Sequence, residues 1–173
     1  MNDPSKVRVR FPPSPTGYFH IGSARTALFN HLFAAHEAGA MVLLGEYTDN
    51  ARSKREYEDD ILEGLRWLGI PYELPVVFRQ SERTAIYRGH SKRLLDAGRA
   101  YEAEAGTEAP DKKVVRFKNP GVDIAFHDLI RGEVSFNTKE LGDFVIAKSA
   151  DEPLYHFAVV IDDHDMGITH VIR

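Results

Sequence analysis

Short apolar segments alternate with longer amphipathic segments along the first half of the chain. The apolar segments predict β-strands and lie at 7–11, 40–46 and 76–78. Each is followed by polar turn residues and then by apolar residues three or four positions apart, which predicts helices beginning near 23, 53 and 81. Strands that alternate with helices predict an α/β fold with a parallel, doubly wound sheet.

The predicted helices have distinct faces and ends. In the first helix, Ala24, Leu28 and Leu32 share one apolar face. At the start of the second, Ser53 and Glu56 have the spacing of a capping box, in which the two side chains cap the first turn. The other predicted helix boundaries are Gly69, Ser81 and Gly98.

The second half of the chain has a different pattern. Residues 102–111 are rich in Ala, Glu, Gly and Pro and predict a linker, and the β-rich runs from 113 onward predict a small antiparallel insertion. The apolar segment 155–161 fits either a core helix or a strand, and 169–173 predicts a returning strand. The predicted divisions are the first half of a core at 1–101, an insertion at 102–150 and a return into the core at 151–173.

Composition and charge narrow the class of protein. The chain is 43% hydrophobic and 28% charged, contains no cysteine and carries a net charge of −4. Without cysteine there is neither a disulfide nor a thiolate zinc site, and no apolar run reaches the ~20 residues of a membrane span. We therefore expect a cytoplasmic monomer without zinc or membrane contact. The acidic balance gives no support to nucleic-acid binding.

A rigid turn joins the first predicted strand to the first helix. Pro12, Pro13, Pro15 and Gly17 prevent regular structure there, and the helical pattern begins only after the segment 20–23. A strand, a polar turn and a helix N-terminus together form an anion site, because free N–H groups and the positive end of the helix dipole point at the same place. The turn therefore predicts a nucleotide site in which His20 and Ser23 reach a phosphate.

The segment PSPTG, followed by HIG and SARTALFN, resembles the glutamyl-tRNA synthetases, which are class I synthetases with a HIGH signature. Segments in the same order as in that family continue to the end of the chain, including FRQSERTAIY at 78–87 and YHFAVVIDDHDMGITHVIR at 155–173. The resemblance implies a Rossmann-like catalytic core with a small β-rich connective insertion. It also implies a reaction of glutamate with ATP, assisted by magnesium, that gives glutamyl-adenylate, and then transfer to a tRNA.

The resemblance assigns roles to individual residues. The implied catalytic residues are His20 and Ser23. The implied ATP-binding residues are Thr16, His20, Gly22 and Ser23, and the implied glutamate-binding residues are Arg10, Ser14, Glu46, Tyr155 and Arg173. No metal ligand is implied.

Each residue also has a simpler explanation. His20 could only cap a helix, Ser14 and Thr16 could only form a turn, and Tyr155 could be a core aromatic residue. The acidic run 162–164 with His170 has the composition of a metal site, but such turns are usually solvated, so no metal is predicted. The same holds for the second acidic group, Asp123, His127 and Asp128.

The chain departs from the family pattern at several points. Leu44, Gly45 and Tyr47 change the family's LRIEDTD segment, which thereby loses an arginine and an aspartate. The insertion after Tyr101 is shortened, and neither a KMSKS-type loop nor an anticodon-binding region follows Arg173. We therefore expect a truncated core, natural or engineered, with doubtful tRNA binding. The open alternatives are a weakly active catalytic fragment, a folded non-catalytic scaffold and a glutamyl paralogue that modifies tRNA.

Overall fold

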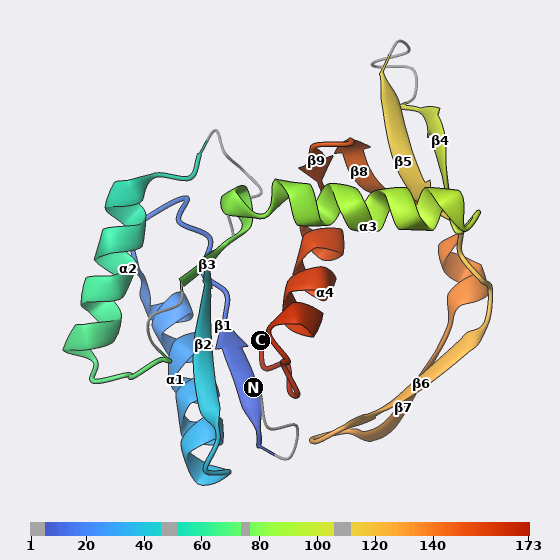
Figure 1. The fold of residues 1–173 in the computed structure, drawn as a ribbon. Coiled ribbons are helices and arrows are strands. Elements are labelled where there is room, and N and C mark those ends of the chain that lie inside the picture. Colours follow the sequence, from blue (N-terminus) through green and yellow to red (C-terminus); the bar gives the residue numbers. More distant parts are fainter. Residues whose placement is uncertain (1–5, 46–51, 74–76, 106–111) are drawn as a thin grey trace. The chain divides into compact units, whose positions relative to one another are not determined.

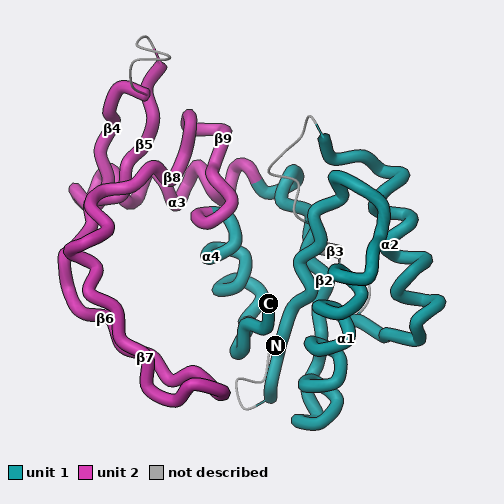
Figure 2. The backbone as a smooth tube through the Cα atoms, turned by 180° about the vertical axis from the view of Figure 1, so that it is seen from behind, with its two compact units in different colours: residues 1–83, 158–173 teal, residues 84–157 magenta. Residues whose placement is uncertain are grey.

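The computed structural model in Figure 1 describes residues 6–45, 52–73, 77–105 and 112–173. The chain forms two compact units, shown in Figure 2. Unit 1 consists of Met1–Arg83 and Ala158–Arg173, and unit 2 consists of Thr84–Phe157. None of the helices in the described ranges is long and apolar enough to cross a membrane.

Unit 1 contains a parallel sheet of three strands in the order β1-β2-β3. The strands are β1 (Arg8–Phe11), β2 (Ala40–Gly45) and β3 (Val77–Arg79). Parallel neighbours need a crossover connection, and the helices α1 (Ile21–His36) and α2 (Arg55–Trp67) supply it. The predicted alternation of strands and helices is confirmed.

Both faces of this sheet are covered. Met41 and Leu43 of β2 pack in one core cluster with residues of α1 and α2, among them Ala27 and Leu65. Val42 and Leu44 point to the opposite face, where they form a second cluster with Met166. That face carries the helix α4 (Tyr155–Asp165), which belongs to unit 1 from Ala158 onward (Figure 1). The apolar segment 155–161 is therefore helical, and the sheet is doubly wound as predicted.

The buried face of α1 differs from the predicted one. Leu28 and Leu32 are 45% and 53% exposed, whereas Ala27, Asn30 and Ala34 are buried. Small residues allow the helix to lie close to the sheet, and the amide of Asn30 donates to the carbonyl oxygen of Ile172 at 3.0 Å. The prediction from apolar spacing was wrong, because hydrogen bonding and close approach, rather than side-chain size, select the buried face.

Several predicted boundaries need correction. The capping box at Ser53 is wrong: α2 begins after Lys54, and within the described residues the buried Ser53 Oγ has no hydrogen-bond partner. Ser81 lies in the short 3-10 helix η1 (Gln80–Glu82), and the next helix is α3 (Thr84–Asp96). Gly69 and Gly98, both with φ of 66°, follow the ends of α2 and α3 as predicted.

The C-terminal segment 169–173 is not a strand, contrary to the prediction. It lies beside β1 through local contacts: the backbone N–H of Thr169 donates to the carbonyl oxygen of Arg8 at 2.9 Å, and Thr169 Oγ1 accepts from the N–H of Arg8 at 2.8 Å. The ring of His170 lies 5.2 Å from that of Phe33. A threonine side chain thus replaces part of the ladder that a strand would have formed.

The turn after β3 binds carboxylates from two helices. Arg79 forms a bidentate pair with Glu58 of α2, with Nη2 to Oε1 at 2.7 Å and Nε to Oε2 at 3.0 Å. Arg83 Nε donates to Asp162 of α4 at 2.7 Å, and Gln80 Nε2 donates to the same carboxylate at 2.9 Å. Asp162 is 0% exposed, so the prediction of a solvated acidic turn at 162–164 was wrong. Buried carboxylates persist only when they are paired in this way.

Unit 2 contains an antiparallel sheet in the order β4-β5-β8-β9, next to a hairpin of β6 and β7, as the β-rich runs predicted. Its strands are β4 (Ala100–Glu104), β5 (Lys113–Phe117), β6 (Asp123–Asp128), β7 (Gly132–Asn137), β8 (Phe144–Ser149) and β9 (Glu152–Pro153), with a 3-10 helix η2 (Thr138–Leu141). Leu94 and Leu95 of α3 pack on Val115 and Ile146 of this sheet. Residues 102–104 of the predicted linker 102–111 belong to β4, so the linker prediction is wrong for these residues. The insertion bounds 102–150 stay a prediction.

We expect Asp162→Ala to lower the free energy of unfolding by ~3–5 kcal/mol, because it breaks a buried pair and removes the acceptor of both Arg83 Nε and the buried Gln80 amide. Urea unfolding followed by circular dichroism measures this loss. The matched control is Asp59→Ala, which removes a helical carboxylate from an exposed pair with Arg55 at 3.3 Å and should change the midpoint little. Equal effects of the two substitutions would contradict the role given to Asp162.

In unit 2, Asp143→Asn should lower the pKa of Tyr101 toward its ordinary 10.0, since the hydrogen bond to Asp143 at 3.0 Å raises it. The N–H of Asn119, and then Tyr101, lower the pKa of Asp143 below 3.8. Because the pKa of Asp143 is lower in the folded state, its carboxylate stabilises the fold at pH values above the unfolded-state pKa. This stabilisation is lost as the pH falls through the folded-state pKa. Absorbance titration with Tyr101→Phe as the assignment control measures the tyrosine. An unchanged tyrosine pKa in Asp143→Asn would refute the contact.

Candidate functional site

The loop between β1 and α1 is attached to α2. The backbone N–H of Phe19 donates to Asp60 Oδ2 at 2.6 Å, and the N–H of Lys54 donates to the carbonyl oxygen of Pro15 at 3.0 Å. The Phe19 ring fills the space above Gly64, where a Cβ atom would lie only 2.3 Å from it. These contacts, together with the fixed φ of the prolines, hold the loop in one conformation.

His20 is the N-cap of α1. Its Nδ1 accepts a hydrogen bond from the N–H of Gly22 at 3.1 Å, and its Nε2 lies 3.2 Å from Ser23 Oγ. Because Nδ1 accepts, the neutral imidazole carries its proton on Nε2 and donates it to the serine. Gly22 allows this close approach, since a Cβ atom there would lie 3.0 Å from the ring. Capping and a fixed tautomer therefore come from the same contacts.

The loop and the first turn of α1 enclose a cleft of about 100 Å³. Its lining residues are Pro13, Ser14, Thr16, Gly17, Tyr18, Phe19, His20, Ser23 and Ile61. The structure thus brings together four residues named from the sequence: Ser14, Thr16, His20 and Ser23. Hydroxyl groups, an imidazole N–H and the positive end of a helix dipole surround the same space, an arrangement suited to an anion.

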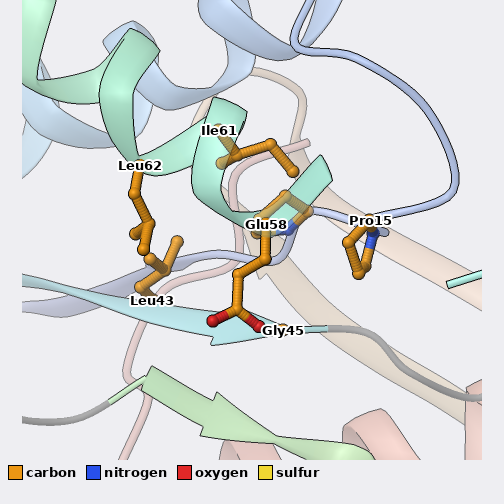
Figure 3. A pocket seen from close by; sticks show the side chains of 7 residues that line it. Pro15, Leu43, Gly45, Glu58, Ile61 and Leu62 are labelled. Carbon is orange, nitrogen blue, oxygen red and sulfur yellow. The ribbon is translucent and has the colours of Figure 1, made fainter. Parts of the chain in front are cut away.

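A second, much smaller cavity of about 10 Å³ lies between α2 and the end of β2 (Figure 3). Pro15, Leu43, Ile61 and Leu62 form its apolar wall, and the Glu58 carboxylate points toward Gly45 (Figure 3). Hydrogen bonding to Glu58 raises the pKa of Arg79, which keeps the guanidinium charged. The cavity has room for one water molecule at most, so it is not a substrate site.

Arg10 lies on the sheet face that α4 covers, and it does not line the larger cleft. The residue is 3% exposed, and its Nε donates to Asp163 Oδ1 at 3.0 Å. Within the described residues its Nη1 is buried and has no hydrogen-bond partner. A buried donor without a partner is costly, so this nitrogen is available to an acceptor that enters the site.

The remaining residues predicted to bind glutamate stay predictions. Glu46 lies outside the described residues. Tyr155 is the half-buried first residue of α4 and belongs to unit 2, and Arg173 is the exposed last residue.

The acidic groups considered for a metal have other partners. The described residues contain no group of three His, Cys, Asp or Glu side chains that could hold a metal ion. In the β6–β7 hairpin, His127 pairs with Glu133 at 2.7 Å, and Asp123 is exposed. Asp128 accepts the N–H groups of Arg131 and Ile130, which lower its pKa.

Sequence reasoning missed three residues that position the site: Asp60, Gly64 and Asp163. An isolated glycine in a helical pattern often marks close packing, so Gly64 carried a signal that a segment lies against α2. Asp60 lies four positions earlier and therefore on the same helical face. Asp163 gave no signal, since its partner Arg10 is 153 positions away in the sequence.

Comparison with known proteins gives consistent results. The family model described as tRNA synthetases class I (E and Q), catalytic domain, matches residues 6–109 and 102–173. Glutamate–tRNA ligase 1 of Rubrobacter xylanophilus is 52% identical over 96% of this chain and 37% of its own length. The glutamate–tRNA ligase of Aquifex aeolicus is 44% identical over 98% of this chain and 43% of its own length. The chain thus spans less than half of these relatives.

Solved structures agree. Glutamate–tRNA synthetase from Elizabethkingia anophelis superimposes with a TM-score of 0.86 and 36% identity, over 96% of this chain and 44% of that one. The glutamate–tRNA ligase from Elizabethkingia meningosepticum, in complex with its amino acid, superimposes with a TM-score of 0.84 and 35% identity. The match covers 96% of this chain and 43% of that one.

We expect His20→Ala to lower the stability by about 1 kcal/mol, which corresponds to a melting temperature ~3 °C lower, because the N-cap hydrogen bond is lost. His20→Asn is the matched control, since asparagine is a good N-cap and should restore the melting temperature. Thermal melts of the three proteins measure the effect. Equal melting of wild type and His20→Ala would show that the cap does not contribute to stability.

Proposed function

The chain belongs to the catalytic-domain family of the class I tRNA synthetases (E and Q), and on this premise we propose that it binds ATP and glutamate and joins them as glutamyl-adenylate. The observation that carries the proposal is the cleft at the N-terminus of α1, where Ser14, Thr16, His20 and Ser23 meet. Its size and its donors fit a phosphate group with part of a nucleotide.

In the proposed reaction, a carboxylate oxygen of glutamate attacks the α-phosphorus of ATP, and pyrophosphate leaves. Negative charge grows on the phosphate oxygens during this step. The Nε2–H of His20, which donates to Ser23 in the free protein, and the hydroxyl of Ser23 are donors already placed at the N-terminus of α1, so they and the helix dipole stabilise this charge with little more than a change of hydrogen-bond partner. Magnesium bound to the nucleotide would neutralise part of the phosphate charge. Thr16 and Gly22 complete the proposed nucleotide contacts.

Arg10 is proposed to bind the side-chain carboxylate of glutamate. A guanidinium presents N–H groups in a planar fork that matches a carboxylate. The buried Nη1 of Arg10 has no partner among the residues that the structure describes, which supports this role, because a ligand carboxylate would satisfy it. Ser14, Glu46, Tyr155 and Arg173 remain further proposed contacts to the amino acid.

Transfer of glutamate to tRNA is the second step of the proposed reaction, and this chain is expected to perform it poorly. Tight tRNA binding draws on many phosphate contacts from Lys and Arg, whereas the net charge here is −4. The two matches to the family model meet at residues 102–109, which supports a shortened connection at that point.

Glutamate should bind at least about tenfold more tightly than glutamine, because a charged hydrogen bond to Arg10 would be lost with the amide. Calorimetric titration of the chain with each amino acid measures the ratio. In Arg10→Gln the preference should disappear. Arg8→Gln, which removes an arginine of the same strand paired with Glu73 at 2.8 Å, should retain it. Equal affinities in the wild type would exclude the pocket.

Pyrophosphate exchange with glutamate as the only amino acid tests the chemistry. His20→Asn should slow it by ~10²–10³, since a donor aimed at the transition state is removed, and ATP affinity should fall much less. The asparagine maintains the helix cap, so this variant separates chemistry from stability. Unchanged exchange would show that His20 has no part in the reaction. No exchange in the wild type would make the chain a binding domain without adenylation.

A further inference from the structure

Two consecutive carboxylates of α4 contact different elements of unit 1. Asp162 contacts Arg83 and Gln80 after β3, whereas Asp163 contacts Arg10 on β1. Successive residues of an α-helix point about 100° apart, so a helix fixed by one of them presents the other in a defined direction. The buried contact of Asp162 therefore determines where the carboxylate of Asp163 lies.

Arg10 is buried, and its contacts differ from those of the half-buried Arg79 and Arg83 of unit 1. Arg79 uses both Nε and Nη2 on Glu58, and Arg83 uses Nε on Asp162 and Nη2 on Asp165. In Arg10, Nε donates to Asp163, whereas the buried Nη1 has no hydrogen-bond partner among the described residues. An arginine with a purely structural role would be expected to use its terminal nitrogens as the other two do.

We propose that Asp163 is a positioning residue, which holds Arg10 through Nε so that the terminal N–H groups face a carboxylate ligand. A hydrogen bond at Nε restricts rotation of the planar guanidinium and leaves the Nη groups for a second anion. The inference rests on the proposed function, because the ligand is the side chain of glutamate. It adds a residue that does not itself contact the amino acid.

The carboxylate of Asp163 also balances the positive charge of the buried Arg10 guanidinium. Arg10 is 3% exposed and would be a buried cation without Asp163, which is 20% exposed at its side chain. One carboxylate stabilises the cation in the free protein, and the buried Nη1, which has no partner among the described residues, is left for a ligand. A single aspartate thus prevents the arginine from collapsing onto another acceptor.

The test compares glutamate and glutamine binding by calorimetry in wild type, Asp163→Asn and Asp165→Asn. Asp163→Asn should weaken glutamate binding about tenfold and glutamine binding much less, because the orientation matters only for the charged contact. Asp165→Asn removes a neighbouring carboxylate of α4 that contacts Arg83 but not Arg10, and should leave the preference intact. Asp163→Glu should restore part of it.

A measurement on the wild type covers the case in which Asp163→Asn does not fold. By NMR, the Nε–H of Arg10 should exchange slowly with solvent before glutamate is added, and glutamate should shift the Nη signals more than that of Nε. Rapid exchange of Nε–H would overturn the inference. Glutamate preference that survives in Asp163→Asn would overturn the inference alone. Absence of glutamate binding by the wild type would overturn the proposed function and the inference with it.

Discussion

A carboxylate buried without any exposure, that of Asp162, constrains the rest of unit 1. A charge at this depth is stable only with close partners, and Arg83 and Gln80 provide them from the turn after β3. The turn must therefore meet α4, which brings the end of the chain onto the sheet. Once α4 is fixed, Asp163 reaches β1 and Arg10. One buried charge thus connects the middle, the end and the start of the sequence.

The contacts of His20 also serve two purposes at once. Helix capping and phosphate binding were alternatives when only the sequence was considered, but the geometry makes them compatible. Capping uses Nδ1, which accepts from Gly22, and this leaves the proton on Nε2, beside Ser23 and the cleft. The cap selects the tautomer that a donor to phosphate needs. Rigidity of the loop, which Phe19 and Gly64 provide, keeps the ring in place.

The fold could be predicted from the sequence where local pattern decides it. The strand–helix alternation, the glycine at 69 and the antiparallel runs of unit 2 follow from apolar spacing and turn chemistry. The buried face of α1 could not be predicted, because Asn30 is buried through a hydrogen bond to Ile172, which lies 142 positions away in the sequence. Burial of Asp162 was likewise invisible, since its partner Arg83 is 79 positions away. A sequence pattern indicates only the usual environment of each residue type, which for asparagine and aspartate is the surface. Asn30 and Asp162 are buried and are therefore exceptions.

The two halves of the proposed site differ in the same respect. The proposed nucleotide half consists of residues from one loop and one helix turn, 14–23, so its geometry is largely local, and the motif names residues that line one cleft. The amino-acid half depends on Arg10, whose orientation comes from Asp163, which in turn depends on the buried pairing of Asp162. The proposed recognition of the amino acid therefore depends on the long-range packing of unit 1, whereas the proposed phosphate site depends mainly on the loop and its contacts with α2.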